Sequence, residues 1–325
     1  MGSRTAIGID IGGTKILGAV VARDGTIVDE HRVPSQPEWP AMRAAILELV
    51  DELRGRNGAI SALGVGAAGM VDRDGTIHYA PNVPGFRNVA VQAELAEATG
   101  LATVVDNDAN TAVYAEYQLG AARGATDAML ITLGTGIGGG MIVDGRVLRG
   151  AHGFAAEVGH FQIDPDGPWC ACGERGHWEA LASGTALGRM ARDAAARGDA
   201  PSVLERAGGS ADKITGLHVS LAAHDRAPDA LELVDRYAFL VAIGLVGLAN
   251  IFDPAVIAIA GGLVNDGDLY LAPIRRHFLG HIEGSQHRVT PEIVPSELGE
   301  HAGVIGAAIL AIDSARPVEQ GSGAA

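Results

Sequence analysis

Two segments of this chain follow the same local plan, and this repetition constrains the fold more than any other feature of the sequence. Residues 6–25 read as a strand, a glycine turn, a second strand and a hairpin turn at Asp24-Gly25, and residues 129–145 repeat that order and end at Asp144-Gly145. Asp-Gly favours a tight hairpin turn, and the glycines leave the turn amides accessible. The sequence therefore predicts a duplicated unit, with two similar α/β lobes and a cleft between them.

Helical patterns fill the intervals between and after these two units, and several of them stop at a glycine. The expected helices are residues 41–54, 91–99, 110–119, 231–252, 268–279 and 304–314, and a short apolar strand is expected at 255–260. Residues 200–228 mix Gly, Ser, Asp and Pro with weak periodicity, so they form either short helices or a surface insertion. Residues 316–325 look like a solvated tail.

Charge and hydropathy exclude several classes of protein. The net charge of −15 over 325 residues argues against a broad nucleic-acid-binding face, because duplex binding depends on Lys and Arg neutralising phosphates. The longest apolar run, Tyr237 to Phe252, is too short to span a bilayer and is expected to be a buried helix. A strand that starts near Ile7 leaves no room for a signal peptide. We expect a cytosolic protein without membrane or nucleic-acid partners.

The first glycine turn, Asp10-Ile-Gly-Gly-Thr-Lys15, follows directly on a strand. Gly12 and Gly13 permit a phosphate to approach the backbone, Thr14 and Lys15 add donors, and Asp10 is suited to holding hydrated Mg²⁺. Taken alone, this pattern fits an ordinary glycine hairpin about as well.

The second glycine turn lies at 134–140 and supplies Gly134, Thr135 and Gly136 as further phosphate contacts. Two such loops facing one cleft are much more specific for a nucleotide than one. Gly261-Gly262, which follow the strand at 255–260, suit the close approach of an adenosine. The order of these loops resembles the actin-like, ribonuclease H-like duplicated ATPase superfamily, whose fold is two-lobed α/β.

The segment Val105-Asp-Asn-Asp-Ala-Asn110 lies between a strand and a helix that starts near Asn110. Asp108 is therefore expected at a helix entrance that lines the cleft. Helix capping by Asp106, Asn107 or Asp108 is a strong alternative for any single residue. Three acidic or amide groups in a row exceed what one cap requires.

These motifs, together with Glu157-Val-Gly-His160 and Trp178-Glu179, resemble the ROK family of sugar kinases over roughly residues 6–315. The resemblance implies that Asp108 is the general base for a sugar hydroxyl, a role that suits a carboxylate within hydrogen-bond reach. It also implies six sugar contacts: Asn82, Asn107, Asp108, Glu157, His160 and Glu179. A solvated charge explains either glutamate alone, and a Pro-rich turn explains Asn82 almost as well.

His160, Cys170, Cys172 and His177 form the expected metal site, and the two cysteines are the only ones in the chain. One residue between them makes a disulfide strained, so metal ligation in a reducing compartment fits better. Thiolates with imidazoles select zinc, and four protein ligands give a structural site. The commonest ROK pattern has a third cysteine where this chain has His177, so a Cys₂His₂ site is expected.

The resemblance implies a kinase that uses ATP with Mg²⁺ to phosphorylate a hexose at C6, most simply glucose. N-acetylglucosamine and mannose stay open as substrates, as does a sugar sensor without catalysis. The chain shows no winged-helix segment ahead of Asp10, which argues against a repressor. The resemblance further implies a homo-oligomer, a dimer or tetramer, with a small lobe at 1–110 completed by a helix at 303–325 and a large lobe at 111–302 that carries a zinc knuckle.

Overall fold

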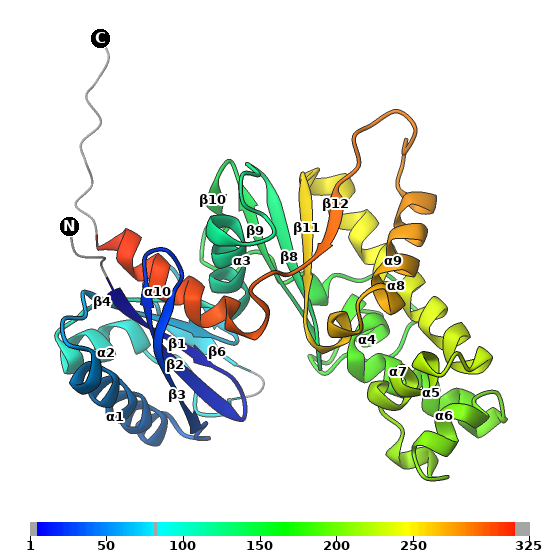
Figure 1. Ribbon diagram of the computed structural model, residues 1–325, viewed down its shortest axis with the longest axis horizontal. Helices are drawn as coiled ribbons and strands as arrows, with labels where there is room; N and C mark the ends of the chain where they lie inside the picture. The colour runs from blue at the N-terminus through cyan, green and yellow to red at the C-terminus, as the bar shows by residue number, and fades with distance from the viewer. Residues whose placement is uncertain (1–4, 81–82, 316–325) are drawn as a thin grey trace. The chain divides into compact units, whose positions relative to one another are not determined.

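The computed structural model describes residues 5–80 and 83–315, and its contacts divide the chain into two compact units. Each unit is built from segments that are distant in sequence (Figure 1). The first unit comprises Met1–Leu119, Arg149–Ala155 and Glu300–Ala325, and the second comprises Gly120–Leu148 and Ala156–Gly299.

The first unit contains a five-stranded sheet in the order β3-β2-β1-β4-β7. Strands β1 to β3 are antiparallel neighbours, whereas β1, β4 and β7 run parallel. The strands are β1 (Thr5–Ile11), β2 (Lys15–Ala22), β3 (Ile27–Pro34), β4 (Ala62–Ala67) and β7 (Ala102–Asn107), with a separate short hairpin of β5 (Met70–Val71) and β6 (Ile77–Tyr79).

The second unit repeats this sheet with the order β10-β9-β8-β11-β12. Its first three strands are again antiparallel and its last three again run parallel. The strands are β8 (Ala128–Leu133), β9 (Ile137–Val143), β10 (Arg146–Val147), β11 (Val256–Ala260) and β12 (Glu292–Pro295). The predicted duplication and the actin-like α/β fold class are therefore confirmed.

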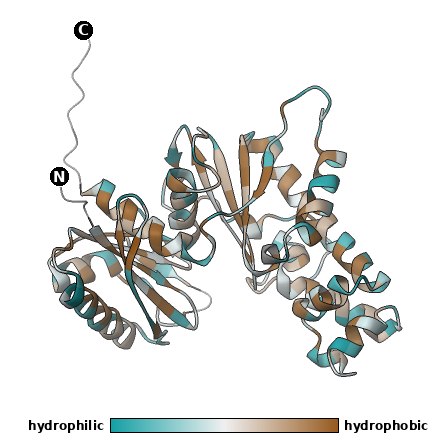
Figure 2. Cartoon of the chain, in the orientation of Figure 1, coloured by the Kyte–Doolittle hydropathy of each residue, from teal (hydrophilic) through white to brown (hydrophobic). Residues whose placement is uncertain are grey.

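Helices cover these sheets, and Figure 2 shows hydrophobic residues along the central strands of both units. The first unit has α1 (Trp39–Asn57), α2 (Val91–Thr99), α3 (Asp108–Leu119) and α10 (Ala302–Ser314). The second has α4 (Trp178–Ala182), α5 (Gly184–Arg197), α6 (Pro201–Arg206), α7 (Gly216–His224), α8 (Pro228–Phe252) and α9 (Asp268–His281). Short 3₁₀ turns are η1 (Val158–His160), η2 (Ala211–Lys213), η3 (Gly262–Asp266) and η4 (Gly299–His301).

The two faces of the first sheet are packed in different ways. Alternate residues of β1, such as Ile7 and Ile9, join the apolar cluster formed with α1 and α2. Gly8, which lies between them, faces α10, and a Cβ on it would lie 2.0 Å from the carbonyl oxygen of Val304. A Cβ on Gly64 of β4 would lie 1.8 Å from the carbonyl oxygen of Ala307. Helix α10 therefore rests directly on the backbone of the sheet.

Three expectations from the sequence need comment. Helix α1 does not stop at Gly55 but runs to Asn57, because Gly58, with φ 77°, supplies the positive-φ residue after the helix. Residues 200–228 form short helices, the first of the two alternatives. The apolar run at 237–252 lies in α8, and no helix within the described ranges is both long and apolar enough to cross a membrane.

The close approach of α10 gives a stability prediction for Gly64→Ala. The added methyl group would collide with a backbone carbonyl that cannot rotate away, so we expect the free energy of unfolding to fall by about 2–3 kcal/mol. Gly55→Ala is the matched control, because nothing lies within 4 Å of a Cβ there and the helix gains stability. Denaturant unfolding followed by circular dichroism measures both. Equal stability of Gly64→Ala and wild type would contradict this packing.

Candidate active site

The first predicted phosphate loop lies between β1 and β2. The N–H of Gly12 donates to the carbonyl oxygen of Lys15 at 3.0 Å, and the hydroxyl of Ser35 donates to the carbonyl oxygen of Gly12 at 2.8 Å. Gly13 and Thr14 are exposed, and among the described residues nothing accepts a hydrogen bond from their N–H groups. The loop is thus held at its ends and offers free amides at its tip, as an anion site requires.

Asp10 lies near the end of β1, half-buried beside the start of α10. A Cβ on Gly303 would lie 3.1 Å from its carboxyl carbon, so the glycine leaves room for the carboxylate. Burial and, to a lesser extent, the negative charge of Asp108 raise the pKa of Asp10 to about 7, against the opposing effect of Lys15. A divalent cation would relieve this unfavourable charge, and carboxylate oxygen is the donor that Mg²⁺ prefers. The site therefore fits a Mg²⁺ ion.

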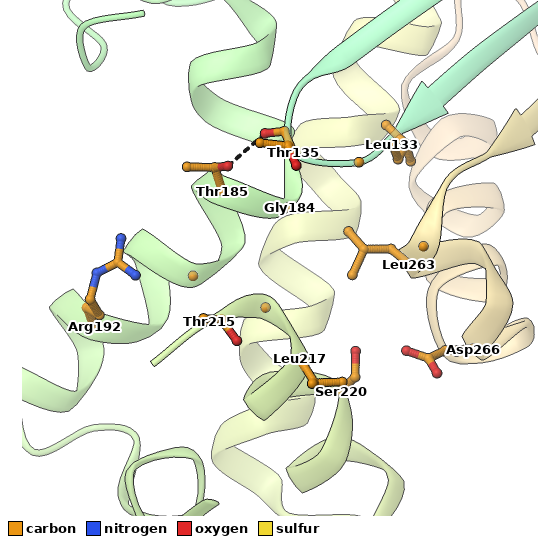
Figure 3. Close-up of a pocket in the computed structure, with 14 residues that line it drawn as sticks. Leu133, Thr135, Gly184, Thr185, Arg192, Thr215, Leu217, Ser220, Leu263 and Asp266 are labelled. Atoms are coloured by element: carbon orange, nitrogen blue, oxygen red, sulfur yellow. Dashed lines mark hydrogen bonds between the residues drawn. The ribbon is translucent and has the colours of Figure 1, made fainter. Parts of the chain in front are cut away.

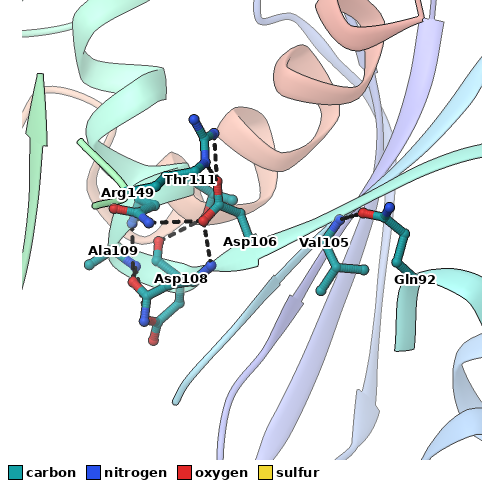
Figure 4. A network of polar contacts seen from close by, with 9 residues as sticks. Gln92, Val105, Asp106, Asp108, Ala109, Thr111 and Arg149 are labelled. Carbon is teal, nitrogen blue, oxygen red and sulfur yellow. Dashed lines mark hydrogen bonds and ion pairs between the residues drawn. The ribbon is translucent and has the colours of Figure 1, made fainter. Parts of the chain in front are cut away.

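Three consecutive residues at the start of α3 make different polar contacts (Figure 4). The side-chain oxygen of Asn107 accepts the N–H groups of Ala109 at 2.9 Å and Asn110 at 3.2 Å, so Asn107 is the helix cap. Asp106 is buried, accepts from Asn107 N–H and Asn110 Nδ2, each at 2.8 Å, and pairs with Arg149. Capping therefore does not account for Asp108.

Asp108 occupies the first position of α3 and is half-buried. Its Oδ1 accepts the N–H of Ala109 at 2.8 Å, and no described residue donates a hydrogen bond to its Oδ2. Burial raises the pKa of Asp108, and the Ala109 hydrogen bond opposes that shift. A carboxylate with one unused oxygen and a raised pKa has the properties of a general base.

The second glycine loop, between β8 and β9, is held by α4 and α5. The carbonyl oxygen of Gly134 accepts the N–H of Gly184 at 2.8 Å, and that of Thr135 accepts the hydroxyl of Thr185 at 2.7 Å. The sequence predicts that Gly136 lacks a side chain so that a phosphate can approach the backbone. In the structure a Cβ there would lie 2.2 Å from Oε2 of Glu179, so this glycine makes room for the glutamate.

A cavity of about 660 Å³ opens beside this loop within the second unit (Figure 3). Its size suits a nucleoside, and polar side chains, leucines and glycines together form its walls. Gly134, Thr135 and Gly262 lie on its wall, as predicted for nucleotide contacts, whereas Gly136 and Gly261 do not. Gly261 instead has φ 105° and passes over the backbone of Leu133, where a Cβ would lie 2.2 Å from the carbonyl oxygen.

Most of the cavity wall was not predicted from the sequence. Arg192, whose Nη1 donates to the carbonyl oxygen of Ile214 at 2.7 Å, comes from α5, and further walls come from α7 and from the turn after β11. Ser183 as N-cap and Gly198 after the last turn mark α5 clearly, so that helix was detectable. The unpredicted polar lining residues are Thr185, Arg192, Thr215, Ser220 and Asp266.

The four predicted zinc ligands lie together. Their ligand atoms are all within 4.8 Å of one another, with Cys170 Sγ 3.8 Å from His160 Nδ1 and Cys172 Sγ 3.2 Å from His177 Nδ1. Tetrahedral zinc places such atoms about 3.3–3.8 Å apart, so the residues fit the metal. Both knuckle glycines, Gly173 with φ 98° and Gly176 with φ 67°, take the left-handed backbone that the tight turn needs.

The expected sugar-binding residues are distributed over both units. Glu157 is exposed, His160 belongs to the zinc cluster, and Asn82 lies outside the described residues. The Oε2 of Glu179 accepts the N–H of Ile137 at 2.9 Å, and its Oε1 lies 3.7 Å from Cys170 Sγ. Glu179 therefore links the second glycine loop to the zinc cluster, a connection that no local motif predicted.

This chain is similar to known proteins along nearly its whole length. The model of the ROK family matches residues 6–314. A glucokinase of Streptomyces coelicolor is 41% identical over 308 residues, covering 94% of this chain and 96% of its own, and one of Thermotoga maritima is 37% identical over 93% and 95%. A structure of a ROK family glucokinase from Streptomyces griseus, in complex with glucose and AMPPNP, is 39% identical with a TM-score of 0.84, covering 95% and 99% of the two chains.

The metal cluster predicts that protein purified without added zinc carries about one zinc per chain. Cys172→Ser should lose most of that zinc and melt at a lower temperature, because three ligands hold the ion less tightly than four. His287→Ala, which changes an exposed histidine outside the cluster, is the control and should keep the metal. Elemental analysis after gel filtration measures both. Zinc retained in full by Cys172→Ser would exclude this ligand set.

The raised pKa of Asp10 predicts how stability depends on pH in protein free of Mg²⁺ and nucleotide. Its pKa is about 7 in the folded protein against an ordinary value of 3.8, so folding favours the protonated form. The contribution of Asp10 to stability is present at low pH and is lost as pH rises through 7.

Asp10→Asn should therefore gain stability relative to wild type by about 1–2 kcal/mol between pH 5 and pH 8. Unfolding in denaturant at both pH values measures this difference. Asp24→Asn is the control: a hydrogen bond from Thr26 lowers the pKa of that exposed carboxyl, so its effect should be flat over the same range. A difference for Asp10→Asn that does not grow with pH would show that Asp10 is ionised throughout.

Proposed function

Since this chain belongs to the ROK family, we propose that it is an ATP-dependent glucokinase, which transfers the γ-phosphoryl group of ATP to the C6 hydroxyl of glucose. The chemical step is supported by one observation: no described residue donates a hydrogen bond to Oδ2 of Asp108. Asn107, not Asp108, caps the helix. The glucokinase relatives support the choice of glucose, because they match along nearly the whole chain.

The base acts on the sugar. Oδ2 of Asp108 accepts a hydrogen bond from the C6 hydroxyl, aligns its oxygen with the γ-phosphorus and takes its proton as the oxygen–phosphorus bond forms and the bond to the β-phosphate oxygen breaks. The raised pKa of Asp108 makes the carboxylate a better proton acceptor than an exposed aspartate. The fixed start of α3 supplies orientation at no further entropic cost.

The glycine loops and the cavity bind the donor. The nucleoside occupies the cavity of the second unit, where Gly134, Thr135 and Gly262 let it approach the backbone. The exposed N–H groups of Gly13 and Thr14 donate hydrogen bonds to phosphate oxygens. Asp10 would hold Mg²⁺, which shields the phosphate charges when it is bound. His160, Cys170, Cys172 and His177 would hold zinc, which fixes the fold of the knuckle.

Glu157, His160 and Glu179 are proposed to bind the sugar hydroxyls, since carboxylates accept two hydroxyl protons at fixed geometry. A cytosolic location is also a proposal, supported by two cysteines that are unpaired at a spacing suited to metal. A homo-oligomer, dimer or tetramer, remains the expectation from the family. The glucose 6-phosphate formed would enter sugar metabolism.

The substrate is tested by coupled measurement of ADP release with ATP and a panel of sugars. We expect kcat/KM for glucose to exceed the values for mannose, N-acetylglucosamine and N-acetylmannosamine. A higher value for one of these sugars would reassign the substrate and leave the kinase class unchanged. No ADP release with any of them would support a sugar sensor instead.

The base is tested by Asp108→Asn, which keeps the size of the side chain but removes the proton acceptor. We expect kcat to fall by about two to four orders of magnitude, while glucose affinity changes much less. Asp74→Asn, at an exposed turn of the same unit, is the control and should keep wild-type kinetics. Steady-state rates and calorimetric glucose binding measure the two effects. A variant of Asp108 that kept most of its kcat would reopen the search for the base, with Glu157 next.

A further inference from the structure

Seven residues, Arg149–Ala155, belong to the first unit although the chain on both sides of them belongs to the second. We call this segment the strap. Gly153 has φ 100°, and a Cβ on it would lie 2.5 Å from the carbonyl oxygen of Val71, so the strap lies directly on the β5–β6 hairpin. The ring of Phe154 meets His78 edge-on at 5.6 Å between centroids. The strap is therefore a built part of the first unit.

The strap begins with an arginine that reaches a buried carboxylate. Nε of Arg149 donates to Oδ2 of Asp106 at 2.7 Å, and its Nη2 donates to the same oxygen at 2.6 Å. The side chain of Asp106 is only 7% exposed, against 30% for Arg149. A carboxylate this deeply buried requires a counter-charge, because without one it would have to turn toward water or take up a proton.

The other oxygen of Asp106 fixes the chain that carries the base. Oδ1 accepts the N–H of Asn107 and the side-chain amide of Asn110, each at 2.8 Å. Asn107 in turn caps α3, and Asp108 follows at the first position of that helix. The polar network in Figure 4 thus runs without a break from Arg149 through Asp106 to the backbone on both sides of Asp108.

We propose that Arg149 is a positioning residue for catalysis: through Asp106 it holds the backbone of Asp108 where the carboxylate can accept the sugar proton. The inference rests on the proposed function of Asp108 as the base. Arg149 needs no contact with substrate for this role. Arg149 lies two residues after β10, which ends at Val147 and pairs with β9, the strand that follows the second glycine loop.

Four variants separate positioning from simple stabilisation. Arg149→Met keeps the length and removes the charge, Arg149→Lys keeps the charge with a single donor group, Asp106→Asn removes the buried charge, and the fourth combines Arg149→Met with Asp106→Asn. For each we measure kcat, KM for ATP and for glucose, and the melting temperature, with rates normalised to folded protein. Arg73→Met is the matched control, because Arg73 also holds the strap, by donating from Nε to the carbonyl oxygen of Gly150 at 3.0 Å, but does not touch Asp106.

We expect Arg149→Met to lower kcat by about 10- to 100-fold, the cost of misplacing a reacting group by around an ångström. KM for ATP should stay within about twofold, since the nucleoside cavity is lined by the second unit alone. Arg149→Lys should recover part of the lost kcat. The double variant should have a kcat about fivefold higher than that of Arg149→Met, because it leaves no unpaired charge buried. Arg73→Met should keep kcat within about twofold of wild type.

A purely structural ion pair would give a lower melting temperature with unchanged kcat per folded molecule, and that result in Arg149→Met would overturn the inference while the glucokinase function stood. Equal losses of kcat in Arg149→Met and Arg73→Met would overturn it as well. If Arg149→Met does not fold, kcat per folded molecule and the melting temperature of Arg149→Lys and of the double variant test the inference in its place. A wild-type protein without sugar kinase activity would overturn the proposed function and this inference together.

Discussion

The close contact between α10 and the first sheet is the constraint on which the rest of the first unit depends. Backbone meets backbone there, because Gly8 and Gly64 lack the side chains that would keep the helix away, and Gly306 brings α10 equally close to the carbonyl oxygen of Thr111 in α3. Helix α3 starts with Asp108, and the first turn of α10 contains Gly303 beside Asp10. The glycines therefore determine where the carboxylates of Asp10 and Asp108 lie.

The burial of these two carboxylates lowers the free energy of unfolding. Asp10 and Asp108 are partly withdrawn from water, and burial raises the pKa of each, with the charge of Asp108 adding to the shift at Asp10. An isolated fold would be more stable with neutral side chains at both positions. A cation at Asp10 and a hydroxyl proton at Asp108 would satisfy the same groups, which is why such strain is typical of active sites.

The second unit connects features that the sequence presents as separate motifs. Glu179 lies in α4, the short helix after the His/Cys cluster, and its carboxylate accepts the N–H of Ile137 at the end of the second glycine loop. Gly136 has no side chain because that carboxylate fills the space. A side chain at Gly136 would therefore displace the carboxylate of Glu179 and disturb the loop that this carboxylate holds.

The sequence by itself determined the duplicated strand order, the two glycine turns, most helices and the four residues of the His/Cys cluster, because each depends on local periodicity, turn chemistry or short spacing. It left open which of Asp106, Asn107 and Asp108 caps α3, since all three are competent caps. Only the tertiary structure assigned the cap to Asn107 and paired Asp106 with Arg149, 43 positions away. It alone also formed the cavity beside the second glycine loop, with walls from α5, α7 and the turn after β11. Such contacts depend on how distant segments pack, so the residues next to a side chain in the sequence do not indicate which distant residue it contacts.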